Sequence, residues 1–190
     1  DLTNTTTITP QIVAPYLDHP SGFVALSPRN QRFTLANLPG FIAYRQHGRH
    51  WIAFGGIHAP PEVQSQLLDA FLVAAQQQHC RVLVVQLRQA QVPLFVTRGA
   101  TINQFGTNFC LTLAGYSFAG TQKMQLRNKI KRARQAGLRV EELGPEGPRD
   151  LAIFQELSNI SQHWLAAKGK PELDFMIGEI GSPNDTLRRI

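Results

Sequence analysis

A run of basic residues, 121–137, limits what this chain can fold into more than any other stretch. The run predicts a single helix, because it holds no Pro and no series of β-branched residues. Thr121 is placed as an N-cap and Gly137 as the residue that ends the helix. At 3.6 residues per turn the apolar positions form one stripe about 60° wide, narrow for a packed helix. These positions are Leu126, Ile130, Ala133 and Gly137.

The cations of this predicted helix have no acidic partners nearby. Between residues 70 and 140 the chain has no Asp or Glu but ten Lys and Arg. A helix that is charged only for solubility usually mixes signs, since opposite charges four residues apart attract and like charges repel. We therefore interpret the helix as facing an anionic partner; the alternative is a solvated charged face. Lys123, Arg127, Lys131 and Arg134 share a sector of about 80°, and Lys129 and Arg132 lie on the far side.

The charge of the chain is concentrated in this middle segment. The net charge is +6, yet residues 1–69 carry four acids and four bases, and residues 141–190 carry nine acids and five bases. Cys80 and Cys110 are too few for a disulfide framework and have no metal-site spacing, which favours free thiols in a reducing compartment. No stretch approaches the 18 apolar residues of a membrane span. The chain does not begin with Met and stops soon after a new unit starts, so we expect a truncated polypeptide.

Strand and helix signals alternate along the rest of the chain. Gly48 supplies the turn of a predicted hairpin, and Pro61 suits the first turn of a helix extending to residue 79. Gly55 and Gly56 indicate a bulge or a close backbone approach to a ligand. Strands are expected at 22–27, 41–45, 51–55, 81–87 (buried on both faces), 105–113 and 138–143. A short helix or turn is expected at 90–98, a turn at 144–148, a helix at 150–168, and a strand or loop at 172–180.

The sequence has no recognisable catalytic motif. It lacks a Ser/His/Asp order, an HExxH pair, a Walker loop and a GxGxxG fingerprint. His58 is expected to cap a helix entry. His163 beside Trp164 either packs on the surface of its helix or lines a cleft. The 115–120 loop directs backbone N–H groups toward the start of the basic helix, where they would suit a phosphate. The catalytic residues therefore stay unidentified.

Three segments in order resemble the catalytic C-terminal domain of bacterial phosphatidylglycerol lysyltransferases and alanyltransferases. They are LRNKIKRARQAGL at 126–138, VEE at 140–142 and LSNISQHWLAAKG at 157–169. The stretch 41–56 followed by Pro60 and Pro61 is similar to the opening hairpin of that family. The resemblance covers most of residues 22–180.

The resemblance implies an α+β fold of the GNAT (acetyltransferase-like) class, a mixed sheet with flanking helices. The expected units are a first GNAT-like unit at 1–119, a basic connecting helix at 120–138, and the beginning of a second unit at 139–190. The implied reaction transfers lysine or alanine from aminoacyl-tRNA to phosphatidylglycerol or a similar acceptor. It needs no cofactor or metal and takes place in the cytoplasm, at the inner face of the cell membrane. The expected partners are aminoacyl-tRNA and an anionic phospholipid surface.

The resemblance and the charge pattern together give two sets of candidate residues. Phosphate contacts to tRNA are assigned to the six cations of the basic helix, and the second set is assigned to a substrate cleft. The phosphate set is Lys123, Arg127, Lys129, Lys131, Arg132 and Arg134. The cleft set is His163, Trp164 and Lys168.

Two other functions stay open from the residues alone. A GNAT-type acetyltransferase would need a pyrophosphate loop, and Arg98-Gly99-Ala100 lacks that spacing. A non-catalytic module that binds RNA or an anionic membrane could use the same basic helix. Tyr116 and Phe118 are the aromatic residues near that helix on which a base could stack.

Overall fold

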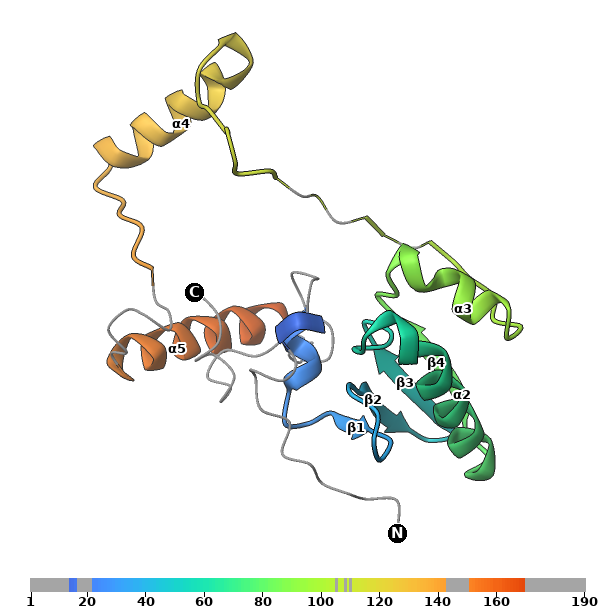
Figure 1. The fold of residues 1–190 in the computed structure, drawn as a ribbon. Coiled ribbons are helices and arrows are strands. Elements are labelled where there is room, and N and C mark those ends of the chain that lie inside the picture. The colour runs from blue at the N-terminus through green and yellow to red at the C-terminus, as the bar shows by residue number, and fades with distance from the viewer. Residues whose placement is uncertain are drawn as a thin grey trace.

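The computed structural model describes residues 14–16, 22–104, 106, 107, 109, 111–142 and 151–169. Its described residues form a four-stranded mixed sheet with flanking helices, as expected for an α+β protein (Figure 1). The strand order is β1-β2-β3-β4; β1 and β2 pair antiparallel, β2 and β3 antiparallel, and β3 and β4 parallel. The strands are β1 Gln31–Phe33, β2 Ile42–His47, β3 His50–Phe54 and β4 Arg81–Val85.

The hairpin predicted around Gly48 is confirmed. His47 pairs with His50, and Gly48 has a φ of 55°, which a glycine adopts without steric cost. Side chains alternate between the two faces of this hairpin, so each strand contributes to two cores. Tyr44 and Trp51 lie on the face that α2 covers, with ring centroids 4.5 Å apart.

Helix α2 (Pro61–Gln77) begins at the predicted proline and covers one face of the sheet (Figure 1). Its apolar stripe is buried at Leu67, Leu68, Phe71 and Ala75. Phe71 is fully buried and lies 5.3 to 5.4 Å from the rings of Phe33, Tyr44 and Trp51. This aromatic cluster is the centre of the larger core, because aromatic side chains bury the most apolar area per residue.

The strand predicted at 22–27 is wrong. Residues Gly22–Leu26 form the 3-10 helix η2, which buries Val24, Ala25 and Leu26 against the other face of the sheet. A strand at the edge of a core buries alternate residues, whereas this segment turns three residues in a row toward the same core. Asn30 stabilises the helical turn, since its Nδ2 donates to the Val24 carbonyl at 2.9 Å.

The strand at 81–87 is confirmed over Arg81–Val85, but its expected burial on both faces is wrong. Within the described residues β4 is an edge strand, paired with β3 alone, and the Leu83 side chain is half exposed. The strands predicted at 105–113 and 138–143 are also wrong over their described residues, which adopt no regular structure. An extended segment is a strand only where a neighbour pairs with its backbone groups.

Between β4 and the basic segment, the 3-10 helix η3 (Gln89–Gln91) leads into α3 (Val92–Val96), which confirms the short helix around Pro93. Gln91 connects α3 to the end of β3: its Oε1 accepts from the Ile57 N–H at 3.0 Å and its Nε2 donates to the Ile57 carbonyl at 2.7 Å. Gly56 has a φ of 82°, and a Cβ there would clash with the Gln91 amide. The backbone approach at Gly56 is therefore to the chain's own side chain, and no bulge interrupts β3.

The remaining described elements are η1 (Ala14–Tyr16), η4 (Thr121–Lys123), α4 (Met124–Gln135) and α5 (Leu151–Lys168). Helices α4 and α5 confirm the helices predicted at 121–137 and 150–168. In the described part of the chain, no helix combines the length and the apolar character that crossing a membrane requires. The turn predicted at 144–148 and the segment at 172–180 lie outside the described residues.

Candidate phosphate-binding interface

The two ends of the basic helix differ in how they are capped. Thr121 is not its N-cap, because Thr121–Lys123 form the 3-10 turn η4 and Lys123 takes the N-cap position of α4 without a capping side chain. Gly137 does end the helix, with a φ of 78°. The Leu138 N–H donates to the Ala133 carbonyl at 3.1 Å, and the Gly137 N–H donates to the Arg134 carbonyl at 3.1 Å. This pair of bonds is a Schellman cap, which glycine permits.

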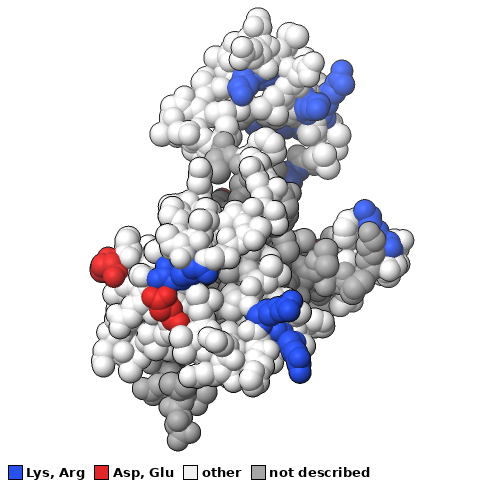
Figure 2. All heavy atoms as spheres, turned by 90° about the vertical axis from the view of Figure 1, so that its right-hand side faces the viewer, with Lys and Arg blue, Asp and Glu red and all other residues white. Residues whose placement is uncertain are grey.

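The six predicted phosphate contacts form an accessible cationic surface. Lys123 is partly buried, and the other five side chains (Arg127, Lys129, Lys131, Arg132 and Arg134) are exposed. Figure 2 shows Lys and Arg on the upper lobe of the molecule and also on its lower part, where the two prominent acidic groups of this face lie beside some of them. Clustered cations without neighbouring acids create a positive potential that attracts a polyanion.

Arg127 has a second role that the charge pattern did not indicate. Its Nη1 donates to the Phe118 carbonyl at 2.5 Å and to the Gly120 carbonyl at 2.7 Å. These bonds fix the loop before the helix against the first turns of α4. Arg127 therefore holds the loop, and Lys131 and Arg134, one and two turns further along, are exposed cations of the same face.

Two aromatic residues in the fixed loop lie beside the cations. The Tyr116 and Phe118 rings contact each other edge to face, with centroids 5.4 Å apart and planes at 87°. The Lys123 ammonium lies 5.0 Å from the centre of the Tyr116 ring, a cation–π contact. Phe118 remains 49% exposed.

The loop and the helix together form an open groove of about 590 Å³. It combines an aromatic ring, an aliphatic side chain and cations, a set that suits a ligand with both a flat apolar part and phosphates. The lining residues are Phe118, Arg127, Ile130, Lys131, Arg134 and Gln135. Three of the six predicted phosphate contacts thus meet in one groove.

The cleft candidates lie on a different helix, α5. The Lys168 ammonium is 4.4 Å from the centre of the Trp164 ring, so these two residues are brought together one turn apart. His163, Trp164 and Lys168 are all exposed, and no residue of α5 is buried among those described. The assignment of these three residues to a substrate cleft stays a prediction.

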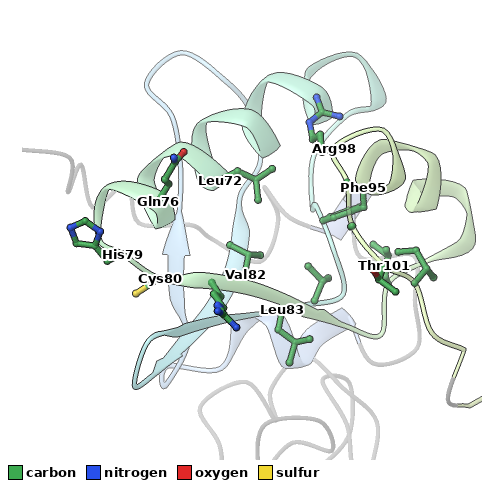
Figure 3. Close-up of a pocket in the computed structure, with 15 residues that line it drawn as sticks. Leu72, Gln76, His79, Cys80, Val82, Leu83, Phe95, Arg98 and Thr101 are labelled. Atoms are coloured by element: carbon green, nitrogen blue, oxygen red, sulfur yellow. The ribbon is translucent and has the colours of Figure 1, made fainter.

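A second hollow, of about 690 Å³, lies along β4 and beneath α2 and α3 (Figure 3). Leu72 and Gln76 reach it from α2, Val82 and Leu83 from β4, and Phe95 from α3. Its lining mixes aliphatic side chains with polar ones, among them His79, Cys80 and Arg81. Among the described residues, no group of three or more His, Cys, Asp or Glu side chains is arranged to hold a metal ion. None of the described residues that line the hollow is an Asp or Glu, so it holds no pair of carboxylates for acid–base chemistry.

His58 does not cap a helix as expected. It is 3% exposed, stacks on Phe41 with ring centroids 5.0 Å apart, and shares a hydrogen bond of 3.0 Å between its Nε2 and the Phe54 carbonyl. Pro60 occupies the N-cap of α2. His58 therefore belongs to the core that joins β2, β3 and the loop after β3.

The comparison with protein families identifies the chain. The sequence model of the family described as "Phosphatidylglycerol lysyltransferase, C-terminal" matches residues 11–189. A phosphatidylglycerol lysyltransferase of Staphylococcus xylosus is 26% identical over 163 residues, which are 86% of this chain and 18% of the relative. One from Staphylococcus epidermidis is 24% identical over 179 residues, 94% of this chain and 20% of the relative. The chain thus spans about a fifth of the length of these curated relatives.

Solved structures share the fold. The structure of L-PGS from Bacillus licheniformis superposes with a TM-score of 0.80 at 17% identity, covering 95% of this chain and 56% of that one. The C-terminal domain (DUF2156) of a putative lysylphosphatidylglycerol synthetase from Agrobacterium fabrum gives a TM-score of 0.77 at 22% identity, covering 88% of this chain and 54% of that one. The mixed sheet with flanking helices is consistent with a GNAT-like class. Because the family model matches residues 11–189 of this 190-residue chain, the chain belongs to the family of phosphatidylglycerol lysyltransferase C-terminal domains.

Proposed function

We propose that the protein containing this chain transfers an amino acid from aminoacyl-tRNA to the glycerol hydroxyl of phosphatidylglycerol. The observation that carries the proposal is the acid-free cationic surface of α4, in a chain of this family. Both co-substrates carry phosphates, and Lys and Arg side chains are the residues that bind them. In this function α4 holds tRNA, and the reaction takes place at the inner surface of the cell membrane.

The proposed reaction is a transesterification. The ester bond between the amino acid and the ribose of the tRNA breaks, a new ester forms with the lipid hydroxyl, and the proton of that hydroxyl passes to the ribose oxygen. The donor ester is already activated, so the protein needs mainly to orient the acceptor, neutralise phosphates and stabilise the developing oxyanion. A chain without a recognisable nucleophile motif is compatible with such a reaction. Lysine and alanine are the proposed amino acids.

The reaction is tested with full-length protein, radiolabelled lysyl- or alanyl-tRNA and vesicles of phosphatidylglycerol. We expect label to move from tRNA into the lipid fraction. If label stays on every aminoacyl-tRNA tried while acetyl-CoA is consumed with an amine acceptor, the chain is part of an acetyltransferase instead. If neither donor is used and RNA is still bound, the chain is a binding module.

The role of α4 is tested with a variant that carries Gln in place of Lys123, Arg127, Lys131 and Arg134. Each phosphate contact contributes about 0.7 to 0.9 to the slope of log affinity against log salt concentration, so the slope for tRNA should flatten by about 2 to 4. Arg49→Gln removes an exposed cation from the hairpin turn and is the control. It should change the slope by less than the value of about 0.7 that one phosphate contact contributes. An unchanged slope in the fourfold variant would show that α4 is not the phosphate platform.

A further inference from the structure

We propose that Phe118 is a stacking surface for one unpaired base at the 3′ end of the tRNA, and that Lys131 and Arg134 hold the phosphates beside that base. The inference rests on the proposed function, because it assigns a part of the same co-substrate to the groove before and along α4. The amino acid is attached to the single-stranded end of a tRNA, so this end has to reach the reaction centre. A single strand is bound by aromatic rings for its bases and by cations for its backbone.

The first reason is the position of an exposed aromatic ring among cations. Phe118 is 49% exposed and lines one groove with Lys131 and Arg134. Burial in a core does not account for this ring, whereas a base would cover it. The edge-to-face contact with Tyr116 sets the relative orientation of the two rings.

The second reason is that the loop is fixed before any ligand binds. Arg127 donates from Nη1 to the carbonyls of Phe118 and Gly120, so it connects the aromatic loop to the helix that carries the cations. A binding surface that is ordered in advance loses less conformational entropy when its ligand binds. Arg127 therefore positions the loop in addition to adding its charge to the groove, while Phe118, Lys131 and Arg134 contact the ligand.

The groove fits a nucleic acid better than a membrane surface. A helix that lies in a membrane interface needs a broad apolar face. Helix α4 has an apolar stripe only about 60° wide, and Met124 lies on the opposite side from Leu126 and Ile130. One aromatic ring that lines a groove together with two cations instead offers contacts for a base and for the phosphates beside it.

The test is a binding measurement with full-length protein and two probes. One probe is a short single-stranded oligoribonucleotide, and the other is a ribose-phosphate oligomer of the same length without bases. Stacking on a side chain contributes about 5- to 150-fold in affinity per base, so the wild type should prefer the first probe by that factor. Phe118→Tyr should retain the preference because the ring remains. Phe118→Leu should lose it because leucine is apolar without a π face.

Salt dependence separates the ring from the cations. Phe118→Leu should leave the salt slope unchanged, whereas Lys131→Gln with Arg134→Gln should weaken both probes and lower the slope by about 1.4, with the base preference intact. Arg127→Lys keeps the charge but loses the planar guanidinium, so it should reduce the base preference more than the slope. Phe109→Leu changes a ring that is 99% exposed outside the groove and should behave as the wild type.

Three results would overturn the proposal. The base preference could survive Phe118→Leu, or Phe109→Leu could remove it equally well. Alternatively, Phe118→Ser could weaken binding to phosphatidylglycerol vesicles while the oligoribonucleotide is unaffected, which would make the groove a membrane contact. The transfer assay distinguishes failure of this proposal from failure of the proposed function. If Phe118→Leu still transfers the amino acid and binds tRNA with full affinity, the proposed reaction is retained and the stacking site is rejected.

Discussion

At the scale of single residues, the contact between Gly56 and Gln91 determines how α3 is attached to the sheet. Gln91 is 2% exposed and uses both ends of its amide on the backbone of Ile57. The bond pair requires the amide to lie directly over Gly56, where a Cβ would clash. A buried amide that loses its partners pays its full desolvation cost. Gly56 is thus needed both for its backbone conformation and for the space beside it.

Substituting Ala at Gly56 should therefore destabilise the fold more than Ala at Gly99. The two glycines have similar φ angles, 82° and 79°, so the backbone strain is matched. Nothing lies within 4 Å of a Cβ built at Gly99. We expect Gly56→Ala to lower the free energy of unfolding by about 1 to 3 kcal/mol more than Gly99→Ala, measured by urea denaturation. Equal losses would mean that the Gln91 amide moves aside without cost.

The sequence indicated part of this site. Paired glycines after a predicted strand signalled that a side chain would obstruct something at that point. The group that a side chain at Gly56 would obstruct is the amide of Gln91, 35 positions further along the chain. A local sequence pattern carries no information on a contact that forms only in the folded chain. The same holds for His58: its neighbours in the chain suggested a helix cap, whereas stacking on Phe41 is a tertiary contact.

At the scale of elements, a network around Arg98 joins the end of α3 to α2. Its Nε and Nη2 donate to the two carboxylate oxygens of Asp69 at 2.5 and 2.9 Å, and its Nη2 donates to Ser65 Oγ at 2.6 Å. The hydrogen bond from Arg98 lowers the pKa of Asp69, and the same bond raises the pKa of Arg98. The Asp69 side chain is 57% exposed, so solvent screens much of this attraction.

The ion pair should make stability depend on pH in one direction. A carboxyl group whose pKa is lowered by folding stabilises the protein above its ordinary pKa of 3.8, and this contribution is lost as pH falls through the folded value. We expect Asp69→Asn to cost about 0.3 to 1 kcal/mol at neutral pH and progressively less below pH 3.8, measured by urea denaturation. A double-mutant cycle with Arg98→Gln is the control. A coupling energy that stays constant down to low pH would contradict the assignment to this pair.

Elements with a strong internal period could be predicted from the sequence, and elements that depend on a distant neighbour could not. Helix α2 and the hairpin around Gly48 follow from apolar spacing and turn chemistry. The apolar alternation around Phe109 and Leu111 indicates which side chains would lie on one face of a strand. It does not indicate whether a neighbouring strand is present to pair with this segment. Both side chains are exposed, and the described residues around them have no regular structure.

At the scale of the whole molecule, the acid-free segment is divided between two places: Arg98 pairs with Asp69 beside α2, whereas the exposed cations of α4 lie on a helix with no acidic residue. The acid-free segment contains the α4 surface, and the charge count alone predicted that this helix would be accessible. The number of charges could not show that Arg127 differs from Lys131 and Arg134. Arg127 bonds to the loop because it lies one turn into α4. The division into units at 1–119, 120–138 and 139–190 stays a prediction.

The parallel pairing of β3 and β4 has a consequence for the order of folding. The hairpin joins neighbours across a two-residue turn, whereas His50 meets Arg81 only after the intervening chain has formed α2 and crossed the sheet. Closing a long loop costs entropy before its contacts form, so distant pairings tend to arise late. We expect the hairpin to be structured in the folding transition state and β4 to dock afterwards.

Two variants measured by stopped-flow kinetics test this order. Gly48→Ala strains the hairpin turn and should mainly slow folding, whereas Val84→Ala removes packing from β4 and should mainly speed unfolding. The reverse distribution of effects would place β4 in the nucleus. Since late contacts are the first to break, the lifetime of the folded sheet would be determined by its last strand, and substitutions that tighten the packing of β4 would prolong that lifetime without changing how fast the chain folds.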